Sequence, residues 1–195
     1  STCCSRRVNM FLVVGLGNPG PDYSHNRHNV GQMVLEVLAS RISSKFKSHK
    51  AGAQVAEGKI AGSKLILAKS KGFMNNSGAP TAALMKFYDL QPENLIVIHD
   101  ELDIDFGQLK IKFSGGHAGH NGLRSISSAV GTEYIRLRFG IGRPPGSQDA
   151  ADFVLKNFST TERKELPVLL ELAADMVQSI ASDGLLSAQT KYHSR

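Results

Sequence analysis

The spacing of hydrophobic and polar residues along the chain predicts strands of two kinds. Near-continuous apolar runs, which are typical of strands buried on both faces, occupy residues 11–15, 64–69 and 94–100. Apolar residues that alternate with polar ones occupy residues 108–113 and 134–140, with a weaker candidate at 53–57. We expect the alternating strands to lie half-exposed at an edge of a sheet or as an antiparallel addition to it.

Apolar residues at helical spacing predict helices that interleave with these strands. The helical segments are residues 30–42, 79–89, 121–131 and 161–182. Segment 143–155 breaks the pattern, and we expect it to be a surface excursion that leads to a short helix. The alternation favours one three-layer α/β/α domain with a mixed, mostly parallel central sheet. We expect this domain to span 10–195 and exclude 1–9 as a flexible N-terminal tail or an expression remnant.

Composition and charge narrow the class of protein only a little. No apolar run approaches the roughly 18 residues that span a bilayer, so we expect no membrane partner. The formal net charge of +6 permits a polyanionic partner without requiring one. The two cysteines, Cys3 and Cys4, are adjacent, which favours neither a disulfide framework nor a zinc site. Their scarcity fits a reducing, cytoplasmic setting.

The first apolar run ends in a glycine pattern that resembles a dinucleotide-binding loop. Gly15, Gly17 and Gly20 have the G-x-G-x-x-G spacing. Such a loop must open a helix at once, because the helix N-terminus holds the pyrophosphate. Here prolines flank Gly20 and the helical pattern starts only near Val30, so the spacing disfavours a nucleotide.

Polar side chains follow several predicted strands, where ligands gather in open α/β sheets. The loops offer Asn18 and His28, then Asn75 and Asn76, then the run His99 to Asp103, and finally His117, His120 and Asn121. No G-x-S-x-G motif is present, so an activated serine of the α/β-hydrolase kind is disfavoured.

These loops carry motifs that identify a family. The motifs are GLGNPG (15–20), RHNVG (27–31), FMNNSG (73–78), HDELD (99–103) and GGHAGHNGL (115–123). In this order the chain resembles bacterial-type peptidyl-tRNA hydrolases, actinobacterial members above all, from Met10 to the C-terminus. The resemblance implies cleavage of the ester between peptide and tRNA, which recycles tRNA from stalled or dropped-off translation. It further implies a cytoplasmic monomer without metal or cofactor.

The resemblance also assigns roles to residues. It implies catalysis by His28, Asp100 and Asn121: His28 activates water, Asp100 fixes the imidazole tautomer, and Asn121 positions the water or binds the oxyanion. Substrate contacts are implied for Asn18, Tyr23, Phe73, Asn75 and His120. Period-two geometry places Lys110 and Lys112 on one strand face and pairs Arg136 with Arg138, which predicts a cationic ridge for tRNA phosphates. An ordinary solvated face is the alternative.

Departures from the family pattern lie outside these residues. Asn26 stands where threonine is usual, and KSKG precedes FMN where proline and threonine are more common. Segment 146–152 lacks the lysines of some members, which puts a tRNA contact there in doubt.

Two other functions stay open at this point. Some plant organelle relatives are RNA-splicing factors, so a non-catalytic RNA-binding protein of the same fold is the runner-up. Release of peptide from a model substrate discriminates it from the enzyme. A metal-dependent hydrolase would instead use ligands among His25, His28, His99, Asp100, His117 and His120. Insensitivity to EDTA would dismiss that alternative.

Overall fold

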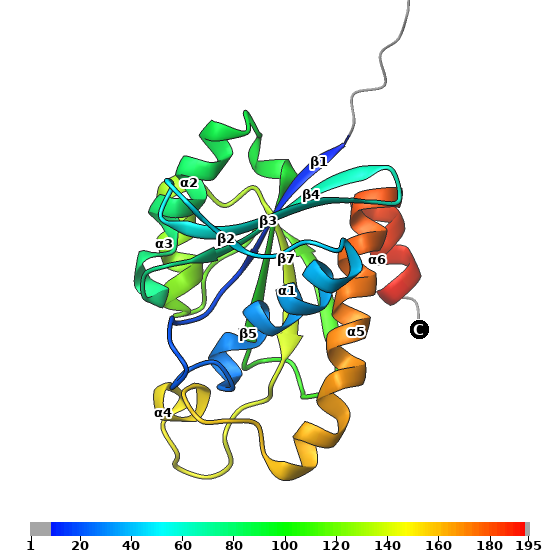
Figure 1. Ribbon diagram of the computed structural model, residues 1–195. Coiled ribbons are helices and arrows are strands. Elements are labelled where there is room, and N and C mark those ends of the chain that lie inside the picture. The colour runs from blue at the N-terminus through cyan, green and yellow to red at the C-terminus, as the bar shows by residue number, and fades with distance from the viewer. Residues whose placement is uncertain (1–8, 194–195) are drawn as a thin grey trace, which may run out of the picture.

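A computed structural model describes residues 9–193 and shows a central sheet between two layers of helices (Figure 1). The strand order in the seven-stranded sheet is β2-β3-β4-β1-β5-β7-β6. The strands are β1 (Met10–Gly15), β2 (Lys47–His49), β3 (Ala53–Ile60), β4 (Ser63–Ser70), β5 (Leu95–Glu101), β6 (Leu109–Phe113) and β7 (Ile135–Gly140). Strands β4, β1, β5 and β7 are parallel, whereas β2, β3 and β6 join antiparallel. The carboxyl ends of the central strands therefore share one end of the sheet.

Helices cover both faces of the sheet, as Figure 1 shows. They are α1 (Val30–Arg41), α2 (Gly78–Phe87), α3 (Asn121–Val130), α4 (Ala150–Val154), α5 (Thr160–Asp183) and α6 (Leu185–His193). Alternate residues of β1 enter different cores: Phe11 and Val13 pack with α1 and α5, and Leu12 and Val14 pack with α2 and α3. This alternation confirms the three-layer α/β/α domain.

The predicted strands and the longer helices are confirmed within one to three residues of their ends, and the weak strand at 53–57 is β3. The expectation that 134–140 is half-exposed was wrong. Strand β7 lies between β5 and β6 and is buried along most of its length. The alternation of Arg136 and Arg138 with apolar residues suggested a solvent face, but the loop before α3 covers Arg136. Strand β6 is the antiparallel edge strand that the pattern predicts.

Helix α6 was not predicted, and it covers the open edge of β6. The backbone N–H of Ile111 donates to Nε2 of His193 at 2.9 Å, and Nε2 of Gln189 donates to the carbonyl of Ile111 at 3.2 Å. These side chains satisfy backbone groups that no further strand pairs.

No helix within residues 9–193 has the length and apolar character needed to cross a bilayer. Residues 1–8, which include Cys3 and Cys4, lie outside the described part of the chain, as do 194–195.

Candidate active site

A cavity of about 960 Å³ lies at the carboxyl ends of the central strands. It brings together residues from loops and strand ends that lie far apart in the sequence. Among its lining residues are Asn18, His28, Phe73, Asn75, Asp100, His120, Asn121, Lys112, Arg136 and Arg138. Tyr23 and Lys110 were also predicted for the site but do not line the cavity.

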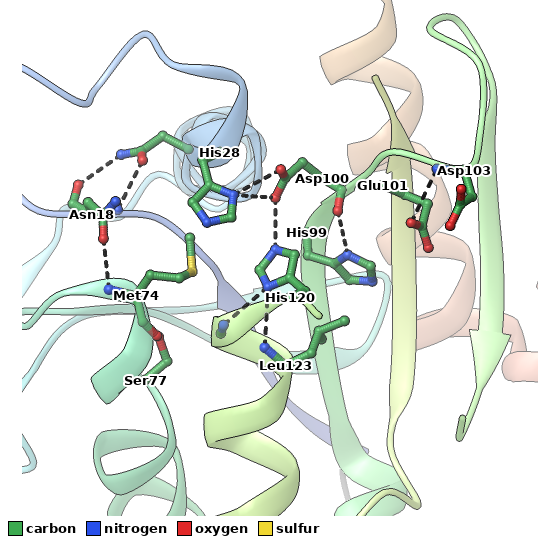
Figure 2. Close-up of polar contacts among 12 residues, drawn as sticks. Asn18, His28, Met74, Ser77, His99, Asp100, Glu101, Asp103, His120 and Leu123 are labelled. Carbon is green, nitrogen blue, oxygen red and sulfur yellow. Dashed lines mark hydrogen bonds and ion pairs between the residues drawn. The ribbon is translucent and has the colours of Figure 1, made fainter. Parts of the chain in front are cut away.

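His28 and Asp100 are in direct contact, although the two residues lie far apart in sequence. His28 belongs to the 3-10 turn η1 (Arg27–Asn29) before α1, and its Nδ1 lies 2.9 and 3.1 Å from the two oxygens of Asp100 (Figure 2). Gly31 permits this approach, because a Cβ there would lie 2.2 Å from the carbonyl oxygen of Ile98 on β5. The bond to Asp100 keeps the proton on Nδ1 and leaves Nε2 as the basic nitrogen.

His120 is the second imidazole bound to Asp100, with Nε2 at 2.9 Å from Oδ1 (Figure 2). Its Nδ1 caps α3 by accepting the backbone N–H groups of Gly122 and Leu123 at 3.1 and 3.4 Å. A nitrogen that accepts two N–H groups carries no proton, so neutral His120 has its proton on Nε2 and donates it to Asp100.

This tautomer bears on the metal-dependent alternative. His28, Asp100 and His120 offer ligand atoms within 4.8 Å of one another. A metal ion needs an unprotonated nitrogen, but the cap of α3 places the proton of His120 on the nitrogen that faces Asp100. The cluster fits hydrogen bonding better than metal ligation. His25, another member of the predicted metal set, is exposed and outside the cluster.

Burial and hydrogen bonding shift the pKa values of this cluster in different directions. Burial opposes the charged form of His28, but the charge of Asp100 and the bond to it raise the pKa of His28 above the ordinary 6.5. Burial alone would raise the pKa of Asp100, whereas His28 and His120 lower it well below its usual range. Burial, then the nearby His120, lowers the pKa of His99 to about 3. Asp100 is therefore ionised and His99 neutral near pH 7.

Asn18 is held by a network from both sides (Figure 2). The side chain of Asn29 accepts the Asn18 N–H at 2.9 Å and donates to the Asn18 carbonyl at 2.9 Å. The Oδ1 of Asn18 accepts the N–H of Met74 at 2.7 Å. Because Oδ1 is occupied, the Asn18 side chain has its NH₂ group to offer a ligand.

Asn75 and Asn121 are exposed at the cavity, at the turn η2 (Met74–Asn76) and at the start of α3. Within residues 9–193 neither carboxamide has a hydrogen-bond partner, so both can bind a ligand. Phe73 is 53% exposed, and Tyr23 meets it edge-on with 6.1 Å between ring centres. These rings form an apolar rim beside the amides, which places Tyr23 next to the cavity rather than in it.

The four predicted cations lie on adjacent strands in one register, with Lys110 beside Arg138 and Lys112 beside Arg136. Their surroundings differ. Lys110 and Lys112 are exposed, and Nε and Nη2 of Arg138 donate to Oε1 of Glu101 at 3.0 and 2.8 Å. Arg136 is only 2% exposed and donates to backbone carbonyls. The structure thus separates Arg136 from the other three.

Sequence reasoning assigned no role to two residues that support the site. Asn29 fixes Asn18, and Arg27 anchors the turn that carries His28 by bonds to Glu162 and to the Phe153 carbonyl. Both flank His28 in the RHN motif and are buried. Polar residues next to a candidate base were the available signal, but their partners are remote in sequence.

The family model described as peptidyl-tRNA hydrolase matches residues 12–195. A peptidyl-tRNA hydrolase of Renibacterium salmoninarum is 61% identical over 189 residues, which cover 95% of this chain and 97% of that protein. One of Streptomyces coelicolor is 54% identical, with 94% of this chain and 95% of that protein covered. The crystal structure of peptidyl-tRNA hydrolase from Acinetobacter baumannii superposes with a TM-score of 0.89 at 34% identity, covering 96% of each chain. The cavity thus lies in a fold shared with these proteins, and the chain belongs to the peptidyl-tRNA hydrolase family.

Proposed function

We propose that the chain hydrolyses the ester of peptidyl-tRNA with a water molecule activated by His28. The observation that carries this role is the contact between His28 Nδ1 and the buried carboxylate of Asp100. It leaves Nε2 of His28 on the side of the cavity where Met74 and Asn18 lie (Figure 2). An imidazole oriented by a carboxylate is the usual general base for attack on an acyl group.

The reaction then follows from the positions of the side chains. Water attacks the ester carbonyl carbon and gives one proton to Nε2 of His28. The oxyanion that forms accepts a hydrogen bond from the carboxamide of Asn121, whose NH₂ group has no other partner within the described residues. Collapse of the tetrahedral species breaks the bond to the tRNA ribose oxygen, and His28 returns the proton to that oxygen. Asp100 stays ionised throughout and stabilises the transient imidazolium.

Substrate contacts divide between two sides of the cavity. Asn18 and Asn75 offer neutral amides to the peptide main chain, and Phe73 with Tyr23 offers apolar surface beside them. Amides that bind main-chain atoms are indifferent to side chains, which suits a substrate of any sequence. On the other side, Lys112 and Arg138 line the cavity, and with Lys110 just outside it they offer charge to tRNA phosphates. His120 contributes through Asp100 and borders the space for the tRNA end.

One chain supplies all of these side chains, so we propose a monomer that works in the cytoplasm, where peptidyl-tRNA arises. The alternative of a non-catalytic RNA-binding protein is not favoured, because the polar residues expected of the enzyme are present and converge on one cavity. RNA binding alone would need the cations but not the pair of His28 with Asp100.

The test is the pH dependence of kcat/KM for an N-blocked aminoacyl-tRNA, with His28→Ala beside the wild type. Because Asp100 raises the pKa of His28 above 6.5, the rate should increase with pH through a midpoint above that value. His28→Ala should lose about 10²-fold to 10⁴-fold in rate while still binding tRNA. Equal rates in the two proteins would refute the role of His28. Binding without release in the wild type would support the RNA-binding alternative.

A further inference from the structure

The two arginines of β7 face the same side of the sheet but have different environments. Arg138 lies beside Glu101 at the cavity surface. Arg136 is buried, with its guanidinium carbon 4.6 Å from the ring centre of Tyr134. Its Nη1 and Nη2 donate to the carbonyls of Gly116 and Gly115 at 2.6 and 2.5 Å. The fork of Arg136 therefore binds two consecutive backbone carbonyls.

We propose that Arg136 is a positioning residue, which fixes the loop 114–120 and through it His120 and Asn121, and not a ligand of tRNA phosphate. This inference rests on the proposed function, since Arg136 acts through two residues of that site. It gives the two β7 arginines separate tasks: one supports the catalytic loop and the other meets the substrate.

The loop 114–120 needs an anchor because its backbone is strained. Ser114 and Ala118 have φ values of 64° and 47°, which residues other than glycine rarely adopt. Gly115 and Gly119 also have positive φ values, 119° and 80°, which glycine adopts without strain. Such a segment holds one conformation only where surrounding contacts determine it. The two bonds from Arg136 reach the loop at Gly115 and Gly116, a few residues before His120.

The part of the loop before His120 has few other attachments. At its start, Ser114 donates through its N–H to the Tyr134 carbonyl at 3.0 Å and through its hydroxyl to Glu133 at 3.3 Å. Two further bonds, from His120 N–H to the His117 carbonyl and from Gly119 N–H to His117 Nδ1, lie within the loop. The described residues offer the carbonyls of Gly115 and Gly116 no donor besides Arg136. Loss of the fork would leave these carbonyls to water and release the segment that leads to His120.

Burial also limits what Arg136 can offer a phosphate, because only 2% of the residue is exposed. Its Nε is buried and has no hydrogen-bond partner among the described residues, so a phosphate in the cavity cannot reach it. Among the described residues, Nε2 of His99 is the other buried side-chain nitrogen without a partner on this face, and the His99 ring lies 5.3 Å from that of His120 between centres. Arg136 thus belongs to the buried support beneath His120.

The decisive variant is Arg136→Lys, which keeps the charge but cannot donate to two carbonyls at once. We expect kcat to fall by about tenfold to a hundredfold, because small displacements of catalytic groups cost that much. The salt dependence of kcat/KM should stay that of the wild type. The control, Arg138→Gln, should raise KM and make the salt slope shallower by about 1, as expected for one lost phosphate contact. Wild-type kcat in Arg136→Lys, or a changed salt slope, would overturn the proposal.

A double-mutant cycle with Asn121→Ala separates this inference from the proposed function. If Arg136 acts through the loop, Arg136→Lys should cost much less in the Asn121→Ala background than in the wild type. Fully additive losses would overturn it. If Asn121→Ala retains wild-type activity, the proposed role of Asn121 fails, whatever Arg136 does.

A measurement on the wild type covers the case in which Arg136→Lys does not fold. Side-chain nitrogen NMR signals of the arginines are followed while deacylated tRNA is added. The Arg136 signals should show hindered rotation before tRNA and stay in place afterwards, whereas those of Arg138 should shift. A shift of the Arg136 signals as large as that of Arg138 would assign Arg136 to phosphate.

Discussion

Arg27 lies face-on over Phe153, with 3.9 Å between the guanidinium carbon and the ring centre, and donates to the Phe153 carbonyl at 3.2 Å. Its Nη2 also pairs with Glu162 at 2.8 Å, and Glu162 caps α5 by accepting the N–H of Ser159. One buried guanidinium therefore joins the turn of His28 to α4 and to the start of α5.

Replacing this guanidinium should weaken both stability and activity. Arg27→Met keeps the apolar volume but leaves Glu162 without its partner, and the free energy of unfolding should fall by about 3 kcal/mol, as for a broken buried pair. The rate should fall too, because His28 follows Arg27 directly. Urea denaturation measures the first effect. Arg41→Met is the matched control: its partners Glu171 and Asp175 are exposed, so it should cost about 1 kcal/mol or less. Equal losses would contradict this account of Arg27.

Asp100→Asn should reduce the rate and move its pH dependence. The carboxamide has the shape of the carboxylate, but it carries no charge and has one accepting oxygen instead of two. His28 therefore loses the bond that fixes its tautomer. We expect a loss of about 10⁴-fold in kcat, by analogy with the same change in a catalytic triad. The charge that raises the pKa of His28 is also gone, so the acid limb of any residual rate should shift to lower pH. An unshifted limb would mean that another group titrates.

Asn29→Ala tests the support of Asn18. It leaves the N–H and carbonyl of Asn18, which is 8% exposed, without partners. The expected loss of stability is about 1–3 kcal/mol, together with a reduced rate because Asn18 is free to move. Thermal and urea unfolding with steady-state kinetics measure both. The same change at the exposed Asn157 should leave stability within about 0.5 kcal/mol of the wild type.

His99 should make the protein less stable in acid. Its pKa is about 3 when folded against an ordinary 6.5, so between these values the unfolded chain binds a proton that the folded one does not. Stability from this group is complete above pH 6.5 and declines as the pH falls toward 3, at up to about 1.4 kcal/mol per pH unit. His99→Phe should flatten that slope in urea denaturation at a series of pH values. A slope in His99→Phe equal to that of the wild type would count against a buried neutral ring.

The fold was largely predictable because the spacing of apolar residues reflects which faces of each strand or helix are buried. The continuous apolar runs at 64–69 and 94–100 became the interior strands β4 and β5, and the stripe at 161–182 became α5. Strand β2 was missed because Lys47, Ser48 and His49 carry no apolar signal, and its pairing with β3 holds it. Helix α6 was missed because it is short and rich in polar residues, some of which bind β6.

The site was predictable in its residue types but not in its contacts. The motifs place amides, imidazoles and a carboxylate on neighbouring strand ends, and the structure gathers them in one cavity. Their individual roles remain predictions. The proton position on His120 depends on the cap of α3, and the burial of Arg136 depends on how the loop 114–120 folds back. Both are tertiary contacts between residues that local pattern treats as independent.

The cover that α6 places over β6 also has a consequence for synthesis. The ribosome synthesises β6 well before residues 185–193. The backbone N–H and carbonyl of Ile111 therefore lack their partners until α6 emerges. During that interval the nascent chain exposes an unpaired strand edge, which can pair with other chains. Truncating the protein so that it ends before Gln189 should therefore favour insoluble aggregates in cells, even though the catalytic cavity lies elsewhere.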